Sequence, residues 1–374
     1  MHLQLDEEQT LIRQSARDFL AQAWTVTQAR AARLDPRGCG DALWRQMAGL
    51  GWTRLLVPDG HGGAGGSFVD VVVLLEETGY ACLPGPFFST AVVGALCLRH
   101  AGTPAACAEL LPLLARGELR LALVLDTQRS DLELADITVM ATPQPAGTRL
   151  DGTVPFVADA AAADLLLCPA RSGTDAIELY RVPANATGLH CTPMPSIGGA
   201  QFCEIGFTEV ELDPAAAIGA PGAVLPGLRQ ALLIATVAKC AEMIGGAQRV
   251  LDTAVTYARD RVQFGRPIGS FQAIQHHCAD MLMDLERARW LTYKAAAAID
   301  RGDPDPVLVA KAKVCCNDSY RHIVRRGHQV MGGIGYCEEH EMPLYFRHAR
   351  MAETAFGDSD GHLASLATQL LGPA

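Results

Sequence analysis

Hydrophobic positions follow a helical period at both ends of the chain and a strand pattern between them. Near the N-terminus, Leu11, Ile12, Phe19 and Leu20 fall at helical spacing. After residue 225 four long amphipathic stretches follow one another, namely 226–260, 271–301, 305–331 and 342–370. The pattern therefore predicts helices at both ends of the chain.

From about Glu118 to Ile218 the pattern changes to short apolar runs separated by Gly, Pro, Asn and Asp. Runs such as "LRLALVL" and "CEIGFTEVEL" have the length of strands. They predict an antiparallel sandwich or barrel of roughly 100 residues. We therefore predict an α+β multidomain protein with an N-terminal helical domain (1–117), a middle β domain (118–225) and a C-terminal helical bundle (226–374).

Length and composition favour a folded protein of several domains. A chain of 374 residues suits two or three domains of about 100–150 residues each. Hydrophobic residues make up 49% and charged residues 19%, which argues against disorder. The formal net charge is -10 and no basic run is present, so the electrostatic pattern of nucleic-acid or anionic-membrane binding is missing.

The twelve cysteines are scattered without CxxC or histidine spacing, so we expect reduced thiols and no metal site. The first residues lack a basic region followed by an apolar one, which is not the pattern of a secretory signal. The most apolar segment, residues 231–250, is interrupted by Lys239 and Glu242 and does not suit a membrane span. We expect a soluble, cytoplasmic protein with no membrane partner.

Arg261, Gln263 and Phe264 stand where a helix is expected to end, followed by Gly265 and Pro267. An arginine fork can hold a phosphate through two hydrogen bonds, and an aromatic ring can cover a planar ligand. On these residues alone, an ion pair between Arg261 and a surface acid is the simpler interpretation.

Two long stretches resemble the acyl-CoA dehydrogenase family. They are "YARDRVQFGRPIGSFQAIQHHCADM" (257–281) and "QVMGGIGYCEEHEMPLYFRHAR" (329–350), and weaker similarity extends over nearly the whole chain. The resemblance implies that family's fold, with an N-terminal helical domain, a β domain and a C-terminal four-helix bundle. It also implies FAD as cofactor, an acyl-CoA substrate and an electron-transfer acceptor.

In that family the first motif, together with the glutamine and glycines of the second, holds the pyrophosphate and adenine side of an FAD bound mainly to a neighbouring subunit. The resemblance carries this role to six residues: Arg261, Gln263, Phe264, Gln329, Gly332 and Gly333. A backbone without a Cβ can approach a dinucleotide closely, although a simple helix stop explains the glycines equally well. The shared site implies a homo- or hetero-oligomer, a dimer or a dimer of dimers.

The family's catalytic carboxylate has no counterpart at its usual places. Alignment of the last motif puts Phe356 where many members carry the glutamate, and the alternative place on the preceding helix corresponds to Ala235. Glu242 lies nearly two helical turns beyond Ala235 and becomes the candidate base, provided that burial raises its pKa. An ion pair with Lys239 is the alternative. Asp358 and Asp360 are weaker candidates, because helix capping explains them; all three carboxylate candidates remain open here.

The middle domain departs from the family as well. Members contact the flavin ring through a Thr-Glu-Pro-Gly turn and through a Trp/Phe-x-Thr/Ser segment. The corresponding pieces here are residues 123–131, which include Thr127, and 156–160, where Ala158 replaces the hydroxyl. Phe156 can still stack on a flavin, whereas a core position is the alternative.

The resemblance thus implies FAD-dependent α,β-desaturation of an acyl-CoA, with the base supplied either by Glu242 or by a second acyl-CoA dehydrogenase subunit. The losses resemble the degenerate subunits of hetero-oligomeric, actinobacterial-type members, which often act on bulky acyl-CoAs including steroid side chains. Two alternatives remain: a non-catalytic subunit that completes or stabilises its partner, and the same fold with a carrier-protein-bound acyl group or other flavin chemistry.

Overall fold

The computed structural model describes residues 5–129, 132–173, 176–198, 201–220 and 222–372. The chain forms two compact units, each assembled from separate segments. The helical unit comprises Met1–Arg30, Phe68–Leu83 and Thr236–Ala374, and the sheet unit comprises Ala31–Ser67 and Pro84–Ala235. The predicted boundaries after residues 117 and 225 divide the chain by the order of its elements, whereas the two units are defined by packing. The predicted domain boundaries therefore stay predictions.

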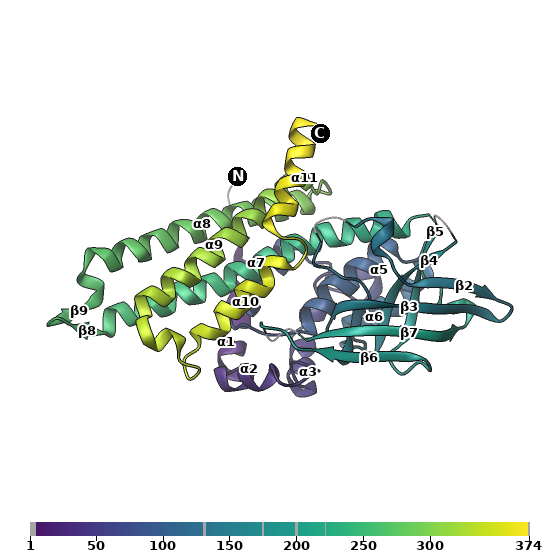
Figure 1. The fold of residues 1–374 in the computed structure, drawn as a ribbon, viewed down its shortest axis with the longest axis horizontal. Helices are drawn as coiled ribbons and strands as arrows, with labels where there is room; N and C mark the ends of the chain where they lie inside the picture. Colours follow the sequence, from purple (N-terminus) through teal and green to yellow (C-terminus); the bar gives the residue numbers. More distant parts are fainter. Residues whose placement is uncertain (1–4, 130–131, 174–175, 199–200, 221, 373–374) are drawn as a thin grey trace. The chain divides into compact units, whose positions relative to one another are not determined.

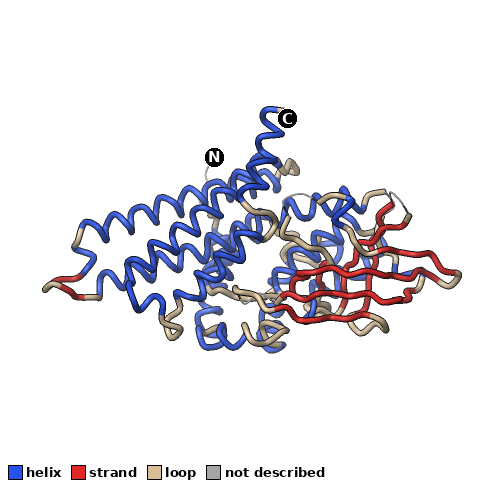
Figure 2. The backbone as a smooth tube through the Cα atoms, viewed as in Figure 1, coloured by secondary structure: helices blue, strands red, loops and turns tan. Residues whose placement is uncertain are grey.

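Helices make up the helical unit apart from one short hairpin (Figures 1 and 2). Its elements are α1 (Glu7–Ala23), α4 (Phe68–Tyr80), most of α7 (Val224–Asp260), the hairpin β8 (Val262–Gln263) and β9 (Arg266–Pro267), η7 (Ile268–Ser270), α8 (Gln272–Asp300), α9 (Pro306–Met331), η8 (Gly332–Tyr336), α10 (Met342–Thr354) and α11 (Ser359–Leu371). Helix α9 packs along α8, α10 and α11. The short helix α2 (Val26–Ala32) leads the chain toward the sheet unit.

Local sequence signals set several helix starts. Asp6 accepts a hydrogen bond from the Gln9 backbone amide while the Gln9 side chain accepts one from the Asp6 amide, which closes a capping box at α1. Asp305 caps α9 and Pro306 occupies its first turn. These short-range bonds satisfy backbone amides that a helix end leaves unpaired.

Helices α4 and α7 meet at two glycines. A Cβ on Gly245 would lie 1.8 Å from the carbonyl oxygen of Glu76, and one on Gly79 would lie 1.9 Å from the carbonyl oxygen of Glu242. Only glycine permits backbones to approach this closely. The crossing therefore fixes where the Glu242 turn of α7 lies against α4.

Among the described residues one helix, α7, is long and apolar enough to cross a membrane, and 67% of its most apolar window is buried inside the protein. Burial of this kind is what a core helix shows. Lys239 and Glu242 interrupt the segment and pair with each other.

The sheet unit combines strands with short helices. Its strands are β1 (Leu121–Leu123), β2 (Met140–Gln144), β3 (Gly147–Ala158), β4 (Leu165–Ser172), β5 (Ala176–Pro183), β6 (Leu189–Met194) and β7 (Phe202–Leu212). Its helical elements are α3 (Asp41–Gly49), η1 (Trp52–Arg54), η2 (Asp59–His61), the π-helical η3 (Phe88–Gly94), α5 (Ala95–Ala101), α6 (Pro104–Ala115), η4 (Leu134–Asp136), η5 (Ala160–Ala162) and η6 (Pro214–Ala216).

The described strands β1 to β7 form one sheet in the order β1-β4-β2-β3-β7-β6, with β5 paired to β4 (Figure 1). Most neighbours are antiparallel, as the sequence predicts, but β1 runs parallel to β4, and β2 touches β4 in parallel at Met140 and Arg171. A parallel pair needs a long connection, and 41 residues separate Leu123 from Leu165. Alternating side chains of β3 and β7, such as Leu150, Val154 and Ile205, supply the sheet's buried face.

Helix η3 is attached to the edge of this sheet. The Thr90 hydroxyl donates to the Leu121 carbonyl at 3.1 Å and accepts from the Leu121 amide at 3.0 Å. These two bonds satisfy backbone groups of β1 on the side where no described strand pairs with it. They fix the π-helical turn relative to the strands.

Candidate functional site

The hairpin after α7 carries the first set of predicted cofactor residues. Its two-residue turn has Phe264 at φ +54° and Gly265 at φ +78°, the left-handed pair that a tight hairpin requires. Phe264 is 91% exposed, and its ring packs edge-on against the ring of Phe271, at a centroid distance of 6.0 Å. A strained, exposed aromatic residue at a hairpin tip points to a ligand or partner.

Arg261 stands beside this turn with its side chain exposed. No described residue forms an ion pair or side-chain hydrogen bond with its guanidinium, so the surface acid considered from the sequence is not found in the described part of the chain. Gln263 is exposed and donates to the carbonyl of its neighbour Val262 at 2.8 Å. The hairpin thus offers a free cation and an aromatic face together.

The second set lies where α9 ends. Gln329 is exposed, and Gly332 caps α9 with φ 63° and ψ -143°, a conformation that essentially only glycine adopts. This confirms the helix-stop interpretation for Gly332. At Gly333 a Cβ would meet nothing within 4 Å, so the backbone there is open to a ligand. Within the described residues no hydrogen bond or ion pair joins this turn to the hairpin.

Phe156 and Thr127 belong to the sheet unit. The register of β3 against β7 shifts between Val154 and Val157, and Phe156 occupies this bulge with φ +55° and 38% exposure. The half-exposed ring packs edge-on against Phe202 at 6.4 Å, so the core alternative does not describe it. A bulge re-aims a side chain, often beside an active site. Thr127 lies half-buried in the turn after β1.

The environment of Glu242 is opposite to the one expected of a base. Its carboxylate is 6% exposed and accepts hydrogen bonds from Lys239 Nζ at 2.9 and 3.0 Å and from His348 Nε2 at 2.8 Å. Burial alone would raise the pKa of Glu242, but the Lys239 charge and the His348 hydrogen bond outweigh it and lower the pKa to about 2. The expected raised pKa is wrong, and the alternative ion pair with Lys239 is present.

The turn around Phe356 is buried, and hydrogen bonds at Phe356 and at Asp358 hold it. Phe356 has φ +59°, is 6% exposed, and its carbonyl accepts from His362 Nε2 at 2.8 Å. Asp358 caps α11 by accepting from the Gly361 amide at 2.8 Å, which confirms the capping interpretation. Asp360 lies in the first turn of the same helix. Both aspartates are exposed at the start of α11, and Asp358 is engaged in its cap.

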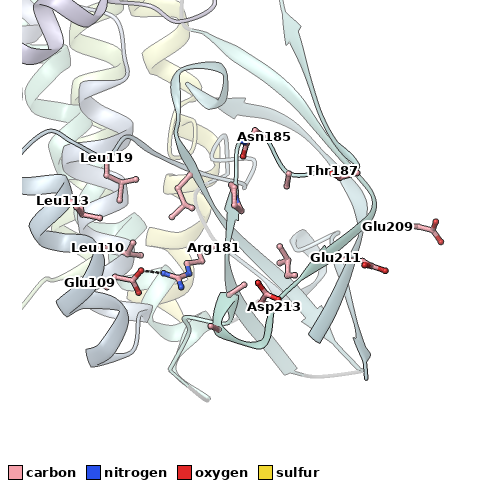
Figure 3. A pocket seen from close by; sticks show the side chains of 16 residues that line it. Glu109, Leu110, Leu113, Leu119, Arg181, Asn185, Thr187, Glu209, Glu211 and Asp213 are labelled. Atoms are coloured by element: carbon pink, nitrogen blue, oxygen red, sulfur yellow. Dashed lines mark hydrogen bonds and ion pairs between the residues drawn. The ribbon is translucent and has the colours of Figure 1, made fainter. Parts of the chain in front are cut away.

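A groove of about 920 Å³ in the sheet unit contains none of the predicted site residues (Figure 3). Leu110 and Leu113 of α6 form part of its apolar wall, and Glu109 and Arg181 pair across it. The groove is therefore not part of the candidate site. No group of three or more His, Cys, Asp or Glu residues able to hold a metal ion occurs in the described ranges.

Comparisons with known proteins agree on the family. Residues 6–118 match the model of the acyl-CoA dehydrogenase N-terminal domain, and residues 228–371 match that of its C-terminal domain. The acyl-CoA dehydrogenase IpdE2 of Mycobacterium tuberculosis is 32% identical over 92% of this chain and 91% of that protein. The chain belongs to the acyl-CoA dehydrogenase family, a family of oxidoreductases.

Solved structures show the same fold. The Tcur3481–Tcur3483 steroid ACAD variant has a TM-score of 0.85 and 28% identity, covering 98% of both chains. The ChsE4–ChsE5 complex of Mycobacterium tuberculosis has a TM-score of 0.89 and 24% identity, covering 100% of both. The predicted fold class is confirmed: a helical N-terminal region, a middle sheet and a helical C-terminal region.

FAD is the cofactor of this family, and the residues present fit it. The free Arg261 guanidinium suits a pyrophosphate, the open Gly333 backbone suits close approach, and the half-exposed Phe156 ring suits a flavin face.

Proposed function

We propose that this chain is a subunit of an FAD-dependent acyl-CoA dehydrogenase that desaturates its substrate together with a second subunit carrying the base. In this reaction a base takes the α-proton of the thioester, and FAD supplies the acceptor for the β-hydrogen, which leaves as hydride, so that a carbon–carbon double bond forms. The observation that carries the proposal is the state of Glu242, the remaining candidate base.

A general base must hold a proton once it has taken it, which requires a pKa near the working pH. Glu242, with a pKa of about 2, ionises readily but hardly retains a proton at neutral pH. The two family positions carry Phe356 and Ala235, which have no titratable group. Arg261, Phe264 and Gly333 remain suited to FAD, so the loss affects the base and leaves the phosphate side intact.

The test is the visible spectrum and the FAD-to-chain ratio of the purified chain, alone and with a candidate partner subunit, followed by anaerobic addition of acyl-CoAs. We expect bleaching only with the partner. Bleaching of the chain alone would contradict the shared site and favour a self-sufficient enzyme. An assembly that takes up FAD but never bleaches would support the non-catalytic alternative.

The role of Arg261 is tested in the same assembly. Arg261→Ala should weaken FAD binding at least tenfold, because a bidentate charge-assisted contact to phosphate is lost. The matched control is Arg259→Ala, which removes an exposed arginine in the last turn of α7, two residues before Arg261, and should bind FAD as the parent does. Equal effects of the two substitutions, measured by flavin fluorescence, would remove Arg261 from the site.

The substrate class we propose is a bulky acyl-CoA, including steroid side chains. The 28% identity to a steroid ACAD supports it. A panel running from butyryl-CoA to steroid acyl-CoAs tests the choice, and exclusive use of short chains would contradict it. The same acyl groups attached to a carrier protein test the alternative that the substrate is bound to a carrier protein. We also propose that the enzyme is oligomeric, which a measurement of its size in solution tests, and cytoplasmic, which cell fractionation tests. It would pass its electrons to a protein acceptor.

A further inference from the structure

The ring-side segment 156–160 contains two non-glycine residues in the left-handed region. Phe156 has φ +55° and Asp159 has φ +57°. This conformation is unfavourable for a residue with a Cβ and persists only where the surroundings impose it. Phe156 is restrained because its neighbours Val154 and Val157 both pair with β7, one on each side of the bulge. The restraint on the other end of the segment comes from Asp159.

Asp159 is anchored by backbone and side chain. Its amide donates to the Gln201 carbonyl at 2.7 Å, and its carboxylate accepts a hydrogen bond from the Ser89 hydroxyl. Asp159 is 8% exposed and Ser89 is 6% exposed, so this bond is shielded from water. Since Ser89 belongs to the π-helical η3, the bond joins the end of β3 to that helix.

The Asp159 carboxylate packs closely against the backbone of Gly85. A Cβ on Gly85 would lie 2.1 Å from both Asp159 carboxylate oxygens. Gly85 in turn is held from a third segment, because its carbonyl accepts from the Cys39 amide at 3.2 Å and would lie 2.5 Å from a Cβ on Gly38. Segment 85–89 thus meets the Asp159 carboxylate at two positions, Gly85 and Ser89, and residues 38–39 hold that segment in turn.

We propose that Asp159 is a positioning residue of the flavin site: its carboxylate, anchored on Ser89, holds segment 156–160 in the conformation that presents the Phe156 ring. The inference rests on the proposed function in assigning this segment to the flavin ring. Sequence inspection missed Asp159 because its partners Ser89 and Gly85 lie about 70 residues earlier in the chain. The aspartate after an apolar strand was its only local signal.

The experiment compares Asp159→Ala, Ser89→Ala and Asp159→Asn. Hydrogen exchange of amides 156–163 is measured in the FAD-free chain, and FAD affinity with the flavin spectrum is measured in the loaded assembly. Asp159→Ala and Ser89→Ala should each speed exchange in this segment at least tenfold and weaken FAD binding at least tenfold. Asp159→Asn keeps an acceptor for Ser89 and should restore both quantities to within about threefold of the parent.

Asp213→Ala is the matched control. Asp213 also starts a 3-10 helix after a strand of the same unit and also makes no side-chain capping bond, but it is exposed. It should leave exchange at 156–163 and FAD affinity unchanged. If Asp159→Ala does not fold, Ser89→Ala still removes the bond while leaving the carboxylate in place.

The outcomes separate this inference from the proposed function. Unchanged exchange in both Ser89→Ala and Asp159→Ala overturns the anchoring role whether or not FAD binds. Faster exchange with unchanged FAD affinity and spectrum reduces Asp159 to a structural residue and also overturns the proposal. A parent assembly that binds no FAD overturns the proposed function together with the flavin role of Asp159, while the exchange measurement still decides whether the carboxylate holds the segment.

Discussion

Glu242 shows at the scale of a single residue how neighbours decide the chemistry of a carboxylate. Local sequence places it among Cys240, Met243 and Ile244, which would favour a raised pKa on burial. His348, 106 residues away, adds a hydrogen bond to the Lys239 charge and reverses that expectation. Glu242 therefore stabilises the fold as an ion-pair partner, and the folded protein requires its carboxylate to be ionised.

Glu242→Gln should lower the free energy of unfolding at pH 7 by about 3 kcal/mol, because it leaves the largely shielded Lys239 ammonium beside an uncharged group. The folded pKa of about 2 lies below the ordinary 4.5, so the stability from this carboxylate is present above pH 4.5 and is lost as pH falls toward 2. Urea unfolding between pH 7 and 3 measures both effects. Glu339→Gln, at an exposed position, is the control, and an equal loss there would contradict the assignment.

At the scale of elements, the crossing of α4 and α7 depends on two glycines. Gly245→Ala should destabilise the protein by about 3 kcal/mol or more, because a Cβ would lie 1.8 Å from a backbone carbonyl that cannot move independently. Gly49→Ala, where a Cβ would meet nothing within 4 Å, should change stability by less than about 1 kcal/mol. Thermal unfolding of both variants measures this; comparable losses would show that the crossing tolerates separation.

Lys313 connects three helices around the turn that carries Phe356. Its ammonium is fully buried and donates to Asn317 Oδ1 at 2.7 Å and to the Ala352 carbonyl at 2.8 Å, at the end of α10. The Asn317 amide in turn donates to Ser359 Oγ at 3.3 Å, at the start of α11. A cation at a helix C-terminus is favourable, so Lys313 holds the end of α10 and, through Asn317, the beginning of α11.

Lys313→Met should cost about 1–3 kcal/mol at pH 7, because buried acceptors lose their donor. Burial lowers the pKa of Lys313 from 10.5 to about 8, so between these values the unfolded chain holds a proton that the folded chain has released. Stability from this group therefore rises with pH across that window, by about 1.4 kcal/mol per pH unit. The difference in free energy of unfolding between the parent and Lys313→Met should therefore grow between pH 8 and 10. The control is Lys311→Met, which replaces an exposed lysine, and its difference from the parent should stay constant over this range.

At the scale of the whole molecule, the two compact units draw on separate segments. The helical unit needs α1 and α4 from the first 83 residues as well as α7 to α11, and α4 is buried along nearly its whole length. A division of the chain after residue 225 would therefore separate elements that pack together. Sequence patterns report the order of helices and strands, but packing decides which of them form one core.

Residues 226–374 expressed alone should lack a fixed fold, because the faces of α7 and α8 that α4 covers would meet water. We expect helical far-ultraviolet circular dichroism, dye binding by exposed apolar surface and fast amide exchange. The full chain, treated identically, is the control. A cooperative unfolding transition of the fragment would support the boundary drawn from the sequence and contradict its dependence on α4.

The sequence by itself determined the order of helices, strands and helices, the family and its flavin. Periodicity and the motifs around Arg261 and Gly332 are written in contiguous residues, so no folded neighbour is needed to read them. The tertiary structure alone decided that Glu242 is paired, that Phe156 stands out from a bulge, that β1 runs parallel to β4 and that Asp159 is anchored on Ser89. Each of these depends on groups far apart in the chain, whose proximity only folding creates.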